Sequence, residues 1–288
     1  MRNEIIEEQD GLGLRIDEII TDKGKMKFEL GISYSTISQD SITSYFDTIQ
    51  TGTGEFIDVP LAIGASQRVA DTMILSLGGR YGLSDKTELY SRASFLYSDE
   101  RAVDGVTGDT TTTTGGNFSS LTLGINHRFR EDDETSGVVG FADITLAENI
   151  AHESTKLAYG KSATVGLTTY RTFDPVVLSA TFGYRPSFSR IIEGDAIDPA
   201  DTFFFNPSIA FAANNEITLT GGVSLRMMGK EKVNGVDKST RKTRGDLEFG
   251  LAYSLDKNTS LQFDTTAGIV GDTNLTLGFK FSKALGRF

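Results

Sequence analysis

Apolar and polar residues alternate strictly in one segment of this chain after another. Residues 25–34 carry an apolar side chain at every second position, namely Met26, Phe28, Leu30, Ile32 and Tyr34. The same period of two recurs in residues 70–83, 217–228 and 243–255. Because successive side chains of a β-strand point to opposite faces, this pattern predicts strands with one apolar and one polar face.

Twelve such segments can be placed along the chain. The predicted strands are 25–36, 72–83, 87–98, 118–130, 136–147, 161–171, 176–188, 203–212, 217–228, 243–255, 260–269 and 274–285. Short turns such as 84–86 mostly alternate with longer polar loops such as 98–117. Strands of about ten residues with short turns at one end and long loops at the other are typical of outer-membrane barrels. We therefore predict an all-β membrane protein, a 12-stranded antiparallel β-barrel of the bacterial outer membrane.

A soluble β-sandwich is the alternative fold, in which the apolar faces of two sheets pack on each other. The polar face of these strands is uniformly small or charged, and no helices are left over to cover a sheet. Both observations favour the barrel, whose apolar face contacts lipid and whose polar face lines the interior.

Residues 37–71 are assigned to a long first extracellular loop of a barrel domain that spans 25–288. Within them, residues 56–66 also alternate, but Pro60 weakens a strand ladder, and single-chain bacterial barrels have an even number of strands. The alternative is a strand extension that stands above the membrane.

Charged side chains fall on the polar face of these strands. Charges are costly against lipid, so we expect them to line a hydrated lumen. The predicted pore-lining residues are Glu29, Arg80, Glu88, Tyr90, Arg92, Arg128, Asp143, Arg185, Arg226, Glu248, Asp264 and Lys280. Alternatively, the charges only pair across the lumen to stabilise the barrel. Twelve tilted strands leave a bore of roughly 12–15 Å, just enough for one helix about 10–12 Å wide.

Residues 1–24 do not alternate, and their pattern suits such a helix. Leu12, Ile16, Ile19 and Ile20 fall on one helical face, with Arg15, Asp17, Glu18 and Asp22 around them. Three basic and seven acidic residues give this segment a net charge of −4, complementary to an arginine-rich lumen. A helical plug and a frayed periplasmic tail both remain open interpretations.

The amino-acid composition excludes several classes of function. The net charge of −11 argues against a nucleic-acid partner, and the absence of cysteine excludes disulfides, thiolate metal sites and cysteine nucleophiles. Two histidines, His127 and His152, lack an evident nucleophile or paired base, so no enzyme, metal or cofactor is expected. No apolar run reaches the roughly 20 residues that a membrane helix needs, and no signal peptide opens the chain.

Two stretches carry a family resemblance. Residues 24–31 (Gly-Lys-Met-Lys-Phe-Glu-Leu-Gly) and 80–89 (Arg-Tyr-Gly-Leu-Ser-Asp-Lys-Thr-Glu-Leu) resemble the phenol-degradation-type outer-membrane channel family. Within it, the acidic lead-in and the twelve strands are most similar to the Fap F-like functional-amyloid secretion channels of Pseudomonas. The resemblance implies a homotrimeric pore in outer-membrane lipid, gated by its N-terminal helix, that exports unfolded amyloid subunits. The periplasmic coiled coil that the resemblance also implies is absent from this sequence, which leaves subunit capture open.

Two channel functions therefore stand side by side. Export of an extended chain suits a polar lining of mixed charge, to which the chain would not stick. Passive uptake of small, including aromatic, molecules is what the wider family implies, and it predicts a more apolar route. The residues favour export, and inward glycines such as Gly166 and Gly183 argue against a lumen filled by large side chains.

Overall fold

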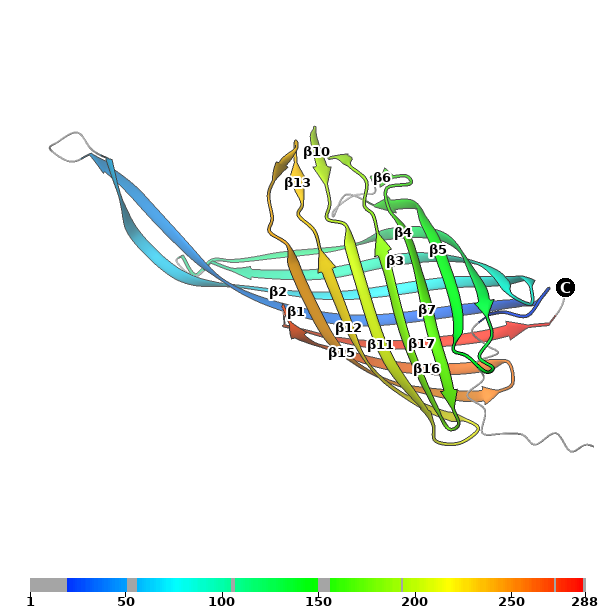
Figure 1. Cartoon of the computed structure of the whole chain (residues 1–288). Coiled ribbons are helices and arrows are strands. Elements are labelled where there is room, and N and C mark those ends of the chain that lie inside the picture. Colours follow the sequence, from blue (N-terminus) through cyan, green and yellow to red (C-terminus); the bar gives the residue numbers. More distant parts are fainter. Residues whose placement is uncertain are drawn as a thin grey trace, which may run out of the picture.

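The computed structural model is a closed 12-stranded antiparallel β-barrel (Figure 1). It describes residues 20–50, 56–104, 107–149, 156–192, 194–271 and 273–286; side chains are described for these except 37–50, 56–68, 273 and 274. Neither an α-helix nor a 3₁₀-helix occurs in these ranges. The described residues include no helix long and apolar enough to cross a bilayer.

Twelve strands form the ring, and each pairs with its neighbours in chain order. They are β1 (Met26–Gln50), β2 (Phe56–Ser84), β3 (Thr87–Val103), β4 (Thr110–Arg130), β5 (Gly137–Asn149), β7 (Ala163–Phe173), β8 (Val176–Arg185), β11 (Thr202–Ala212), β12 (Ile217–Met228), β15 (Lys242–Asp256), β16 (Thr259–Val270) and β17 (Thr273–Leu285). The first and last strands pair from Met26↔Leu285 to Ser38↔Thr273, which closes the ring. The predicted strand number and the closed topology are therefore confirmed.

The segment predicted as a long first loop is a strand extension instead. Strand β1 continues to Gln50 and β2 begins at Phe56, so most of residues 37–71 form a hairpin that stands out from the barrel in Figure 1. The register shifts where Phe46 pairs with Pro60, which leaves Leu61 as an extra residue. Proline lacks an N–H for the ladder and is tolerated at a bulge, so Pro60 does not end the strand.

Short strands extend the side of the barrel with the long loops. The strand β6 (Leu157–Ala158) pairs with the end of β5. A separate small sheet has the order β14 (Val236–Asp237), β13 (Lys232–Val233), β10 (Asp195–Asp198) and β9 (Arg190–Ile192). Residues 110–114, a threonine run interpreted as loop, belong to β4 and pair with the end of β3. Threonine's β-branched side chain suits a strand, which explains this difference.

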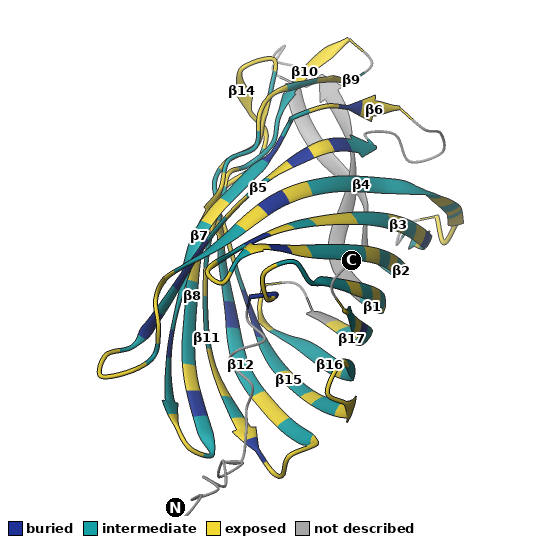
Figure 2. Ribbon diagram, turned by 90° about the vertical axis from the view of Figure 1, so that its right-hand side faces the viewer, coloured by how far each residue is buried: buried dark blue, intermediate teal, exposed yellow. Residues whose placement is uncertain are grey.

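Large apolar side chains cover the outer face. Alternate residues of the ring strands are exposed, as the changing colours along the ribbons in Figure 2 show. Aromatic residues near the ends of the strands predicted from sequence belong to this set, including Tyr34, Tyr81, Tyr97, Phe129, Tyr184, Phe203 and Phe211. In water such a surface would be a liability, whereas aromatic girdles around an apolar band are what a barrel presents to a bilayer.

Candidate functional site in the barrel interior

All twelve residues predicted to line the pore lie on the face opposite the exposed apolar side chains. Glu88 on β3 connects several of them and is fully buried, with 0 % of its surface exposed. Its Oε1 accepts hydrogen bonds from Arg80 Nη1 at 2.8 Å and from Asn126 Nδ2 at 2.7 Å. Arg80 Nε lies 3.1 Å from Glu29 Oε1, so a network joins β1, β2, β3 and β4 across the wall.

The residues that precede β1 dock on this network. The backbone N–H of Thr21 donates to Glu88 Oε2 at 2.7 Å. Ile20, only 2 % exposed, packs with Val139, Tyr170 and Val177, which come from β5, β7 and β8. The chain therefore crosses the interior from the β5–β8 wall to β1.

Gly82 on β2 makes room for this crossing. Lys23 forms a parallel bridge with Gly82, and Gly24 N donates to Gly82 O at 2.8 Å. A Cβ at position 82 would overlap the carbonyl oxygens of Thr21 and Asp22. We call residues 20–24 the docked segment. Three features hold it in place: the space left by the missing side chain of Gly82, the buried carboxylate of Glu88 and the apolar packing of Ile20.

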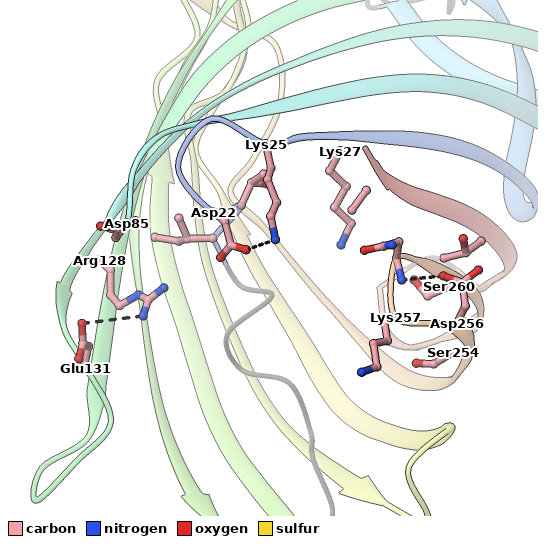
Figure 3. Close-up of a pocket in the computed structure, with 15 residues that line it drawn as sticks. Asp22, Lys25, Lys27, Asp85, Arg128, Glu131, Ser254, Asp256, Lys257 and Ser260 are labelled. Atoms are coloured by element: carbon pink, nitrogen blue, oxygen red, sulfur yellow. Dashed lines mark hydrogen bonds and ion pairs between the residues drawn. The ribbon is translucent and has the colours of Figure 1, made fainter. Parts of the chain in front are cut away.

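The docked segment occupies one side of the barrel mouth at the end that carries the short turns. Beside it lies a cavity of about 630 Å³ that reaches to the β15–β16 turn (Figure 3). Four acidic and four basic side chains line it, namely Asp22, Asp85, Glu131 and Asp256 with Lys25, Lys27, Arg128 and Lys257. The mouth is therefore polar and balanced in charge.

Of the residues predicted to form a plug helix, two are described. Ile20 and Asp22 belong to the docked segment, where the backbone is not helical, and Asp22 Oδ2 accepts from Lys25 Nζ at 2.6 Å. Leu12, Arg15, Ile16, Asp17, Glu18 and Ile19 lie outside the described residues. The plug helix itself therefore stays a prediction.

Aromatic rings on the inner face lie over glycines of neighbouring strands. Tyr90 is directly opposite Gly124, and its hydroxyl passes over that glycine to donate to Asp143 Oδ2 at 2.9 Å. Phe141 and Phe204 cover Gly166 and Gly183, and their rings stack at 6.4 Å and 22°. The inward glycines, interpreted from sequence as open space, are thus covered in part. Sequence showed both residue types but not which glycine lies opposite which ring.

Other interior charges pair around a residue that sequence reasoning did not single out. Asp246 on β15 is 1 % exposed and lies 3.3 Å from both Arg226 Nη2 and Arg244 Nε. Glu248 follows on the same face. Asp246 fits the same alternating pattern as its neighbours, so nothing in the sequence indicated that it is buried. This cluster and the Arg80 network agree with the alternative that lumen charges pair to stabilise the wall.

Two further cavities lie along the inner face. One of about 330 Å³ is lined by Arg80, Tyr90, Arg92, Asp143 and Arg185, among others. The second, of about 200 Å³, contains Glu29, Arg92, Asp264 and Lys280. The structure thus brings together most of the predicted lining residues in two groups that share Arg92. Arg226 and Glu248 belong to neither group, and Arg128 lies at the mouth.

Hydrogen bonds tie the acidic turn after β4 to the barrel. Asp132 accepts hydrogen bonds from Thr172 N at 2.7 Å and Arg171 Nη1 at 3.2 Å. Burial acts to raise the pKa of Asp132, but the Thr172 bonds and the Arg171 charge outweigh it and lower that pKa.

The residues described include no cluster of three metal-ligating side chains. His127 bonds to Thr87 Oγ1 at 2.8 Å and stacks edge-on with Phe129.

No model of a known protein family matches the sequence. Solved structures do share the fold. An outer membrane channel from Pseudomonas putida matches with a TM-score of 0.63 and 12 % identity, over 92 % of this chain and 97 % of that one. The autotransporter transport unit AIDA-I from Escherichia coli has a TM-score of 0.54 and 9 % identity, over 92 % and 91 %. The translocator domain of the autotransporter NalP from Neisseria meningitidis reaches 0.53 and 10 %, over 93 % and 91 %.

The closed ring, the apolar outer band and this shared fold define the class. The chain is an outer-membrane β-barrel, and the solved structures that share its fold are an outer membrane channel and the transport domains of two autotransporters.

Proposed function

We propose that this barrel is a gated pore that passes extended, unfolded amyloid subunits through its interior to the cell surface. The observation that carries the proposal is the docked segment, seated inside the mouth of a polar interior by Glu88 and Gly82. The segment is held by one apolar side chain and two hydrogen bonds to the barrel, from Thr21 N to Glu88 and from Gly24 N to Gly82. Such a small set of contacts can be displaced at modest cost, since each contributes about 1–3 kcal/mol.

The lining also supports passage of a peptide chain. Polar side chains and balanced charge at the mouth offer an unfolded chain little apolar surface to adhere to. The amyloid cargo and the homotrimer come from the family resemblance alone. Both stay predictions.

Passive uptake of small aromatic molecules is a second candidate, favoured by one specific observation. The stacked rings of Phe141 and Phe204 form an apolar surface on the inner face, supported by Gly166 and Gly183. A small aromatic molecule could stack there, because offset and edge contacts between rings are favourable.

Conductance in planar bilayers tests the gate. We compare the full chain with a variant lacking residues 1–23, with Gly82→Ala and with Gly79→Ala. Alanine at 82 displaces the docked segment, whereas a Cβ at 79 meets nothing nearer than Ser91 Oγ at 3.8 Å. We expect a mostly closed parent and Gly79→Ala pore, and open pores for the truncation and Gly82→Ala. Equal conductance of all four would contradict gating.

Transport into proteoliposomes separates the two candidates. Labelled unfolded amyloid peptide should cross only through the variants with open mouths if the pore exports protein. If phenol crosses and the peptide does not, and if Phe204→Ala slows phenol entry, the uptake function is the correct one.

A further inference from the structure

Arg92 on β3 holds a central place in the interior. It lines both the 330 Å³ and the 200 Å³ cavity, whose other walls come from β2, β4, β5, β7 and β8 on one side and β1, β16 and β17 on the other. Nine of the twelve ring strands therefore contribute side chains or backbone to the space around one guanidinium.

The three arginines that line the 330 Å³ cavity differ in how they are paired. Arg80 contacts the carboxylates of Glu29 and Glu88 at 3.1 and 2.8 Å. In the part of the chain that the structure describes, no ion pair joins Arg92 to a carboxylate, and Arg185 contacts only the hydroxyl of Ser162, at 3.4 Å. Both side chains are exposed to the interior.

The carboxylate in this cavity is already engaged. Asp143 accepts the hydroxyl of Tyr90 at 2.9 Å and forms no ion pair with either arginine. Three arginines thus face one carboxylate in a space of about 330 Å³, even though the whole chain carries a net charge of −11. Asn126, Thr122 and Thr164 supply further polar groups at its walls.

We propose that Arg92 and Arg185 form an oxyanion-binding site in the lumen, which makes the pore selective for anions and for carboxylate- or phosphate-bearing solutes. Guanidinium groups bind carboxylate and phosphate oxygens with paired, charge-assisted hydrogen bonds, and basic side chains line pores that pass anions. This proposal rests on the proposed pore function and specifies that the solutes passing the pore are negatively charged.

Two measurements test the site. Inorganic phosphate is the probe for the site, added to the full chain. In a salt gradient, the reversal potential of Arg92→Gln and Arg185→Gln should shift toward cations, and the double variant should shift further. Titration calorimetry of detergent-solubilised protein with phosphate should show an affinity weakened roughly tenfold for each variant. This corresponds to the loss of about one charge-assisted hydrogen bond. Arg226→Gln removes the same charge from an arginine already paired with Asp246, and it should change both readouts little.

The outcomes separate the site from the pore. Channels that conduct, with neither readout more sensitive to Arg92 and Arg185 than to Arg226, overturn the oxyanion site and leave the pore intact. Phosphate binding that depends on Arg92, in a protein that never conducts, overturns the pore and leaves the site.

Discussion

At the scale of single residues, the interior combines charges that are neutralised by partners with charges that are not. Glu88 satisfies an arginine, an amide and a backbone N–H at once, and Asp246 lies between two arginines. A buried carboxylate without such donors would be strongly unfavourable, so these residues stabilise the wall. Arg92 and Arg185 have no such role in the described structure, which leaves them free for a solute.

Asp132 allows a test at this scale. Its lowered pKa means that ionised Asp132 stabilises the fold above the unfolded-state pKa of about 3.9. That contribution is lost as the pH falls through the lower folded-state pKa. Asp132→Asn should therefore lower the free energy of unfolding by about 1–3 kcal/mol at pH 7 and have little effect in strong acid.

Urea unfolding in detergent micelles at the two pH values measures this difference. Asp133→Asn is the matched control, since among the described residues the side chain of Asp133 bonds only to Thr135 N, at 3.3 Å. A pH-independent loss for Asp132→Asn would show that the charge does not stabilise the turn.

At the scale of elements, the β1–β2 hairpin divides into two parts. Up to Ser38, β1 pairs with both β17 and β2, and β2 pairs with β3 from Gln67 onward. Among the described residues, 41–50 and 56–66 pair only with each other, and an isolated two-stranded hairpin is marginally stable in water. The extension therefore contributes little to barrel stability.

Shortening the hairpin tests this division. Replacing residues 42–65 by Asn-Gly joins Ser41 to its partner Ser66 through a tight hairpin turn. We expect a folded barrel, seen as heat-modifiable migration on gels, with single-channel conductance equal to the parent's. Loss of the folded band would show that the extension is needed for assembly.

At the scale of the whole molecule, lipid takes the place of a packed core. The apolar side chains face outward, and few described residues form an apolar cluster inside. Leu77 lies at the middle of residues 72–83, the part of β2 predicted to span the membrane, and is 48 % exposed on this outer face. Leu77→Arg should lower the free energy of unfolding from liposomes by about 2–4 kcal/mol.

Thr266→Arg is the control for that measurement. Thr266 lies on the inner face, directly opposite Glu248, so an arginine there meets water and a carboxylate instead of lipid. A cost for Thr266→Arg as large as that for Leu77→Arg would contradict the assignment of the two faces.

The alternation in the sequence was enough to determine the fold class, the number of ring strands and the face on which the twelve predicted lining residues lie. These are local properties, because the direction of a strand side chain depends only on its parity. The same reasoning misjudged residues 37–71 and 110–114, since loop and strand extension differ in whether a partner strand is present.

The residues that each side chain contacts could be identified only from the tertiary structure. Which glycine lies under Phe141, which carboxylates pair with Arg80, and where Ile20 packs depend on cross-strand register and on closure of the ring. Those contacts join residues as distant in the sequence as Ile20 and Val177. Periodicity cannot specify them, because every register that shifts a strand by two residues preserves the same faces.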